Sequence, residues 1–235
     1  MTPSPIRSML LAATLTVATG GAALAADAAH PTVVELFQSQ GCSSCPPANA
    51  NLMAIASRPD VLALSFGVTY WDQLGWKDTF AQDTFTARQW DYARGLHHPN
   101  VFTPQVVVNG RRDGVGADRS ELTGLIAAGD RGTSGPSLSV AGGKIVLGAG
   151  RVPAGGADVW LVRFDPRIVQ VPVTRGENAG RTLPHRNVVR ELVRLGRWNG
   201  EAKILAAPPV RDPALSTAVL VQQSGGGPIL AATRA

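Results

Sequence analysis

The stretch VVELFQSQGCSSCPP, residues 33–47, decides the fold of this chain. It places an apolar run typical of a buried strand, residues 33–37, shortly before Cys42 and Cys45, which are the only cysteines in 235 residues. Prolines at positions 46 and 47 fit a first helical turn, because N–H groups there lack intrahelical partners. The stretch therefore predicts a strand, a turn that carries a C-x-x-C pair, and a helix that begins around Cys42.

The two thiols are expected to differ in reactivity. Cys42 should lie beside unpaired N–H groups at the positive end of the helix dipole, which favours the thiolate, so we expect it to be the nucleophile. Cys45 lies one turn further on, at the start of an apolar helix face, and should be the resolving thiol. This interpretation requires that Cys42 face the solvent and that Cys45 be sheltered.

Other uses of the cysteine pair stay open. The pair could be an inert structural disulfide, or a Cu(I) site on two thiolates, since soft metals accept sulfur ligands. Zinc normally takes four ligands, and the chain has no second cysteine pair. A closed zinc site is therefore not expected, and no resident metal or cofactor is predicted.

Residues 1–26 have the features of an export signal. Arg7 is the only charge before Asp27, residues 9–17 are apolar, and Ala23-Leu24-Ala25 fits a small-residue cleavage motif. We therefore expect a periplasmic or secreted protein with no stable membrane insertion after cleavage. The formal net charge of +5 is mild and its basic residues are scattered, which argues against nucleic-acid binding.

Residues 33–129 alternate between strand and helix patterns. The strands are expected at residues 33–37, 61–68, 106–108 and 111–115, and the helices at residues 45–57, 84–96 and 118–128. The order is βαβαββα, an α/β fold with the dithiol at the carboxyl end of its first strand. Active sites of open α/β sheets form at that end.

The rest of the chain has a different pattern of secondary structure. Short strands separated by Gly and Pro predict a β-rich unit over residues 133–235 behind an α/β domain over residues 27–132. Residues 187–195 fit either a helix or a strand, and we favour a strand. A polar loop at residues 175–181 could bind an anion or approach the dithiol, but it lacks the pattern of a phosphate loop.

The element order, the C-x-x-C pair and Thr103-Pro104 before the third strand resemble the thioredoxin fold. That resemblance implies a cis bond before Pro104, which then borders the dithiol, and a Thr103 backbone that binds an extended substrate peptide. A closer match is to the DUF1223 family of exported, thioredoxin-like bacterial proteins. The motifs that carry it are ELF (35–37), SQGCSSCPP (39–47), YWD (70–72), LGWKD (74–78), TPQ (103–105) and GENAGRTL (176–183). The chain departs from this family at residues 67–69, where Gly-Val-Thr stands in place of His-Val-Asp.

Three further residues are candidates for the site. Glu35 lies on the first strand and could relay a proton beneath the disulfide, although its register is offset by one from the thioredoxin acid and could turn it away. Trp71 and Trp76 follow the second strand and could line a substrate groove, or could only pack a long connection onto the domain.

Taken together, these features predict thiol–disulfide exchange with a thiol- or disulfide-containing protein substrate. Cys42 would form the mixed disulfide, Cys45 would resolve it, and Pro104 would shape the site. A binding module that carries copper or a passive disulfide is the alternative, so whether the protein is an enzyme stays open.

Overall fold

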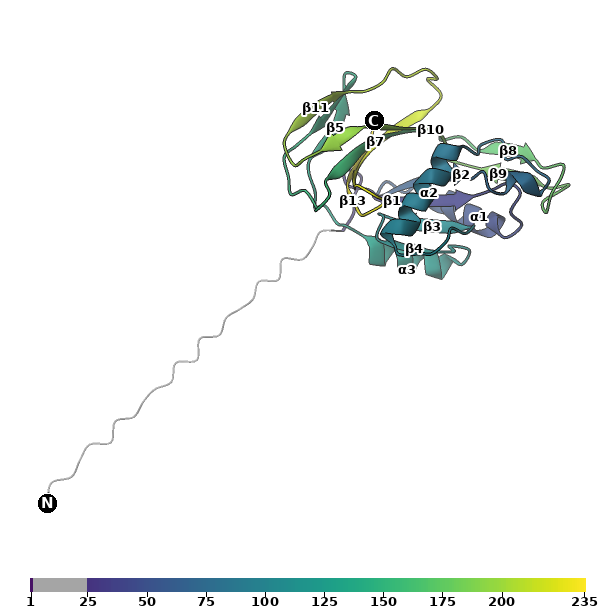
Figure 1. Ribbon diagram of the computed structural model, residues 1–235, viewed down its shortest axis with the longest axis horizontal. Helices are drawn as coiled ribbons and strands as arrows, with labels where there is room; N and C mark the ends of the chain where they lie inside the picture. The colour runs from purple at the N-terminus through teal and green to yellow at the C-terminus, as the bar shows by residue number, and fades with distance from the viewer. Residues whose placement is uncertain (2–24) are drawn as a thin grey trace.

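The computed structural model describes residue 1 and residues 25–235 and shows an α/β protein (Figure 1). Most of the predicted export signal, residues 2–24, lies outside the described residues. Among the described residues, no helix is both long enough and apolar enough to span a membrane.

The first strand, β1, is buried along its whole length. Its sequence TVVELFQ is apolar at most positions because the strand lies inside the sheet and packs side chains on both faces. It pairs in parallel with β2 and antiparallel with β3, and Phe37 lies opposite Gln105. The elements of this half are β1 (Thr32–Gln38), α1 (Cys45–Ile55), β2 (Val61–Gly67), η1 (Asp72–Leu74), α2 (Asp83–Gly95), β3 (Gln105–Val108), β4 (Arg112–Gly114) and α3 (Arg119–Gly129).

The helices cover opposite faces of these strands. Helices α1 and α3 pack on the face that presents Val34 and Leu36. Helix α2 packs on the other face, against Val33 and Phe37. Because neighbouring strand residues point to opposite faces, this arrangement decides which side chains of β1 can lie beneath α1.

The second half is rich in strands, as predicted. Its elements are β5 (Leu138–Ala141), β6 (Lys144–Leu147), β7 (Ala157–Asp165), β8 (Val169–Pro172), β9 (Thr182–His185), β10 (Val188–Trp198), β11 (Lys203–Ala206), β12 (Ser216–Gln223) and β13 (Ile229–Arg234). The ambiguous residues 187–195 fall mainly in β10 and are extended. The sheet β11-β6-β5 and the strands β7, β12 and β13 enclose a second apolar core around Ile145, Leu161 and Trp198.

Strands from both halves form one eight-stranded sheet in the order β13-β12-β7-β10-β2-β1-β3-β4. The junction between the halves is short: β10 meets β2 at Val188 opposite Ser65. The side chain of Asn187 reinforces it by donating a hydrogen bond of 2.8 Å to the carbonyl of Ala63. The proposed division at residues 132 and 133 stays a prediction, because the two parts share this sheet.

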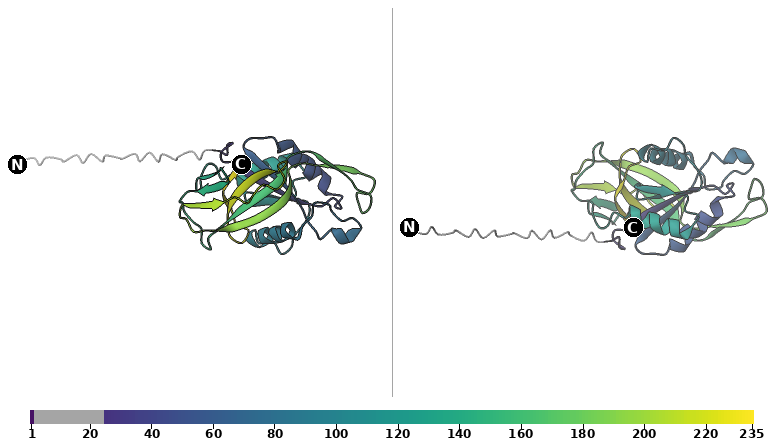
Figure 2. Two further views of the ribbon diagram at one scale, coloured as in Figure 1. Left: turned by 90° about the horizontal axis from the view of Figure 1, so that it is seen from above. Right: turned by 90° about the horizontal axis from the view of Figure 1, so that it is seen from below.

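The β8–β9 hairpin was not predicted from the sequence. It forms its own two-stranded sheet, lies beside α1, and is at the opposite end of the molecule from the sheet β11-β6-β5 (Figures 1 and 2). Its strands are four residues each and the second contains Pro184, which weakens the strand pattern. The hairpin places the polar loop of residues 175–181, called the latch loop below, against the turn that carries the cysteines.

Candidate functional site

Cys42 and Cys45 form a disulfide in the turn between β1 and α1, with Cα atoms 5.4 Å apart. The turn is held by hydrogen bonds from the N–H of Cys42 to the carbonyl of Ser39 (3.1 Å) and from the N–H of Cys45 to the carbonyl of Cys42 (3.2 Å). The helix begins at Cys45, as in the expected range of residues 45–57, and Cys42 lies in the turn before it rather than at the helix start. Pro46 and Pro47 remove two of the N–H groups that a helix start normally offers.

Neither sulfur-bearing residue faces the solvent. Cys42 is 0% exposed and Cys45 is 1% exposed. The expectation of a solvent-facing Cys42 is therefore wrong for this oxidised state. The reason is a tertiary contact: the latch loop covers the turn from a segment more than 130 residues away in the chain.

Asn178 makes the central contact of the latch loop. Its side chain is fully buried, and its Nδ2 donates hydrogen bonds of 2.9 Å to the carbonyls of Gln40 and Cys42. The guanidinium of Arg181 in turn donates a bond of 2.7 Å to Asn178 Oδ1. The amide of Asn178 therefore bonds on both its nitrogen and its oxygen, and it fixes the backbone on either side of Gly41.

Glu177 makes a second, exposed contact beside Asn178. Its carboxylate accepts hydrogen bonds from the hydroxyl and the backbone N–H of Ser43, at 2.6 and 3.0 Å. These two bonds lower the pKa of Glu177, with the hydroxyl as the larger cause. The carboxylate is thus charged at neutral pH, when it holds the latch loop against the C-x-x-C turn.

The predicted groove residues gather around the same turn. The indole N–H of Trp71 donates to the hydroxyl of Thr103 at 2.7 Å, and that of Trp76 donates to Gln40 Oε1 at 2.9 Å. A side chain added at Gly41 would lie 3.9 Å from Trp71 Cβ. Both tryptophans are half-buried, so they pack the connection against the turn and keep part of each ring at the surface.

Pro104 lies at the same end of the sheet. It is buried, it precedes Gln105, which pairs with the end of β1, and the Thr103–Pro104 bond is cis, as the resemblance implies. The structure thus brings Thr103 and Pro104 to the carboxyl end of β1, from which the cysteine turn departs.

Glu35 is not beneath the disulfide. It belongs to the face of β1 that packs on α2, and its carboxylate accepts hydrogen bonds from Arg88 Nε at 2.7 Å and Nη2 at 3.1 Å. The hydroxyl of Tyr92 donates to the same carboxylate. The one-residue offset noted in the sequence therefore turns Glu35 away from α1, and the interpretation as a proton relay is corrected to a buried ion pair.

The buried acid near the cysteine turn is Asp78. Its carboxylate accepts hydrogen bonds from the N–H groups of Gln40 and Phe80, each at 2.7 Å, and it forms no salt bridge within the described part of the chain. Burial raises its pKa to about 6, against the effect of these bonds. Asp78 therefore anchors the backbone two residues before Cys42.

Gly67 explains the departure from the family pattern at residues 67–69. A Cβ at this position would lie 2.8 Å from the backbone nitrogen of Ala81 and 2.9 Å from the carbonyl carbon of Phe80. The absence of a side chain lets the segment that contains Asp78 approach the end of β2. No proton-transfer or metal role can therefore be assigned to a histidine here.

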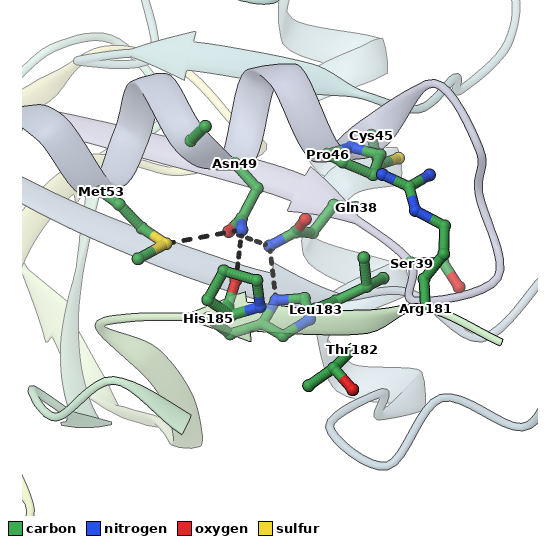
Figure 3. Close-up of a pocket in the computed structure, with 12 residues that line it drawn as sticks. Gln38, Ser39, Cys45, Pro46, Asn49, Met53, Arg181, Thr182, Leu183 and His185 are labelled. Atoms are coloured by element: carbon green, nitrogen blue, oxygen red, sulfur yellow. Dashed lines mark hydrogen bonds between the residues drawn. The ribbon is translucent and has the colours of Figure 1, made fainter. Parts of the chain in front are cut away.

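A pocket of about 350 Å³ opens beside Cys45 (Figure 3). Its walls are the end of β1, the first turns of α1, and β9 with Arg181. On one side, Gln38 Nε2 donates to Asn49 Oδ1 at 3.0 Å and lies 3.4 Å from His185 Nδ1. Burial, together with the charge of Arg190, lowers the pKa of His185 to about 4, so its ring is neutral at pH 7.

The described residues contain no group of three or more His, Cys, Asp or Glu side chains placed to hold a metal ion. In the disulfide form, the cysteine sulfurs are bonded to each other. A metal at this place would need the reduced pair.

Comparison with known proteins places this geometry in a family. One family profile, described as "Protein of unknown function (DUF1223)", matches residues 33–222. The chain belongs to the DUF1223 family. No curated protein matches it.

Two solved structures resemble this DUF1223 protein. The crystal structure of a protein from Agrobacterium tumefaciens is 33% identical, with a TM-score of 0.71 over 89% of this chain and 94% of that one. HBP35 of Porphyromonas gingivalis is 11% identical, with a TM-score of 0.57 over 88% of this chain and 74% of that one. At that identity, the second likeness concerns the fold alone.

Three residues of the site were not singled out from the sequence: Asp78, Asn178 and His185. Asp78 and Asn178 lie inside motifs of the family resemblance, but nothing local to them indicates that both bond to Gln40. His185 lies outside those motifs. The residues that neighbour the cysteines in the sequence do not indicate these three side chains, because each comes from a distant segment of the chain.

Proposed function

We propose that this DUF1223 protein is an exported, thioredoxin-like protein that exchanges thiols and disulfides with protein substrates through Cys42 and Cys45. The observation that carries the proposal is a Cys42–Cys45 disulfide between β1 and α1, at the carboxyl end of a central strand. The element order β1-α1-β2-α2-β3-β4-α3 supports the thioredoxin-like assignment. Export rests on the sequence pattern of residues 1–26.

The exchange would proceed through a mixed disulfide. A substrate thiolate attacks the sulfur of Cys42, a bond forms between the two sulfurs, and Cys45 leaves as a thiolate. A second substrate thiolate then attacks the substrate sulfur of the mixed disulfide and releases Cys42. The substrate has lost two electrons and the protein has become a dithiol; the reverse sequence reduces a substrate disulfide.

Burial requires that the latch loop move before a protein thiol reaches Cys42. The contacts to be broken are the two bonds of Asn178 and the two bonds that Glu177 accepts from Ser43. The hydroxyl of Ser44 lies 3.3 Å from the sulfur of Cys42 and could donate to it as a thiolate. In this proposal the disulfide is covered in the closed protein and reacts only when the latch loop has moved away from the cysteine turn.

The test uses single cysteine variants of the mature protein. Cys45→Ser should accumulate mixed disulfides with disulfide-containing proteins of its own compartment and with a disulfide-containing test peptide, because its Cys42 thiolate attacks the substrate disulfide and the second substrate sulfur leaves as a thiolate. Dithiothreitol should release them. Cys42→Ser is the matched control and should accumulate far fewer, and the double variant none. Absence of adducts in Cys45→Ser, also when Asn178→Ala is added to loosen the latch loop, would contradict the proposal.

A passive structural disulfide is the second candidate function, and the burial of both cysteines favours it. In that case no variant forms adducts, while loss of the disulfide lowers the free energy of unfolding by about 2 kcal/mol, the value expected for so short a loop. In a Cu(I) carrier, the thiolates of Cys42 and Cys45 would be the only ligands of the metal. Titration of the reduced protein with Cu(I) tests it, since stoichiometric binding should be lost in either single variant.

A further inference from the structure

The pocket beside Cys45 has the size and lining of a small-ligand site. Its volume of about 350 Å³ lies at the small end of the roughly 300–1,000 Å³ typical of such sites. The apolar part of its lining comes from Pro46, Ala50 and Met53 on α1 and from Leu183 and Pro184 on β9. An apolar group that entered would be enclosed between the helix and the hairpin.

The polar groups of the wall are mostly occupied by one another. Asn49 Nδ2 donates to the carbonyl of Pro184 at 2.6 Å, and Asn49 Oδ1 accepts from Gln38. His185 is 3% exposed, and its Nε2 has no hydrogen-bond partner among the described residues. This wall therefore offers a ligand little polar surface, since its amide groups bond to one another and His185 Nε2 is itself inaccessible.

The charge at the pocket is positive. Arg181 at its rim is the only lining residue that is charged at neutral pH, and no carboxylate belongs to the lining found among the described residues. The Arg181 side chain is exposed, and its one hydrogen bond in the described part of the chain goes to Asn178 Oδ1, which is neutral. The guanidinium thus keeps N–H donors that are not used by Asn178, and it forms no salt bridge with any residue that the structure describes.

We propose that this pocket binds a small amphipathic carboxylate, with its apolar body between α1 and β9 and its carboxylate on Arg181. Planar carboxylates match the fork of a guanidinium, and the uncompensated charge favours an anion over a neutral molecule of the same shape. The site lies next to Cys45 but does not depend on exchange chemistry, so it goes beyond the proposed function.

The test compares octanoate with octanamide, which has the same chain length but no charge. Both are titrated into the oxidised protein, and binding is followed by NMR shifts of the backbone amides of α1 and β9. Octanoate should saturate and octanamide should bind more weakly. Arg181→Gln should weaken octanoate binding about fivefold, the effect of one exposed ion pair, and leave octanamide unchanged. Arg175→Gln, in the same loop but outside the pocket lining, is the control and should bind as the wild type.

A second variant fills the pocket. Ala50→Phe places a ring in it from an exposed position of α1 and should abolish binding of both probes, whereas Ala54→Phe, one turn further along and outside the lining, should not. The proposal is overturned if octanoate causes no saturable shifts, if Ala50→Phe binds as the wild type, or if Arg181→Gln affects both probes equally. No thiol reacts in this titration. A negative result would therefore overturn the carboxylate site without affecting the test of thiol–disulfide exchange with Cys45→Ser.

Discussion

Two buried carboxylates of this protein have opposite surroundings. Glu35, inside the sheet, is bonded to Arg88 and Tyr92 and lies on the α2 side of β1. Asp78, beside the cysteine turn, is bonded by backbone N–H groups and has no salt bridge among the residues that the structure describes. Both are nearly inaccessible to solvent, at 0% and 4% exposed.

Burial of a charge is compensated differently in the two regions. The opposite charges of Glu35 and Arg88 compensate each other inside the sheet, so this ion pair has a structural role in the core. Asp78 keeps an incompletely compensated charge, and its pKa is raised to about 6. The buried acid with a raised pKa near the cysteine turn is therefore Asp78, whereas Glu35, the acid that the thioredoxin resemblance suggested, belongs to an ion pair of the core.

The largest effect should come from breaking the ion pair. Arg88→Met leaves the Glu35 carboxylate buried without its partner and should lower the free energy of unfolding by about 3–5 kcal/mol, measured by urea denaturation. Adding Glu35→Leu should recover most of the loss, and Arg94→Met, on the exposed face of α2, should change it by less than about 0.5 kcal/mol. The rate at which dithiothreitol reduces the disulfide should not change; a large change in that rate would show that the two regions are coupled.

The pH dependence of stability tests Asp78. Its folded pKa of about 6 lies above the ordinary value of 3.8, so the folded state holds the proton more tightly. The stability that this group contributes is fully present below pH 4 and is lost as the pH rises through 6, by about 3 kcal/mol in all. Asp78→Asn should remove this fall, measured as the difference in unfolding free energy from the wild type between pH 3.5 and pH 7.

The control for this experiment is Asp212→Asn, at an exposed loop position, which should follow the wild type at every pH. A constant difference between Asp78→Asn and the wild type across the range would mean that Asp78 has an ordinary pKa. The contrast with Glu35 would then disappear.

The smallest effect concerns the latch loop. Asn178→Ala removes the two hydrogen bonds that hold the latch loop to the cysteine turn, together with the bond from Arg181 within the loop. Loss of the two bonds to the turn lowers the cost of opening the loop by about 1–2 kcal/mol, so dithiothreitol should reduce the disulfide about tenfold faster. Asn199→Ala, in an exposed loop far along the chain, is the matched control. Equal rates in Asn178→Ala and the wild type would show that the latch loop does not limit access to the sulfurs.

Much of the fold could be predicted from local patterns. The apolar run of β1, the C-x-x-C turn and the helix after it follow from neighbouring residues, and the structure places them close to the expected ranges. The strand at β10 and the α/β class were also confirmed. The β8–β9 hairpin was missed, since two four-residue strands, one with a proline, give too short a pattern.

The neighbourhood of several site residues could also be expected from the order of the strands. Trp71, Thr103 and Pro104 gather near the turn because the ends of the strands do. The side chain of Glu35 could not be placed from sequence alone, because a one-residue difference in register sends it to the opposite face of β1.

Local sequence is enough to bring the two sulfurs together between a strand and a helix, since the turn that joins them needs only four consecutive residues. Tertiary structure alone decided that the sulfurs are covered and that a pocket opens beside Cys45. Those features depend on Asn178 and Arg181, which reach the turn across 136 and more residues of chain. Contacts at such separation depend on how the sheet and hairpin pack, and no local pattern of residues encodes that packing.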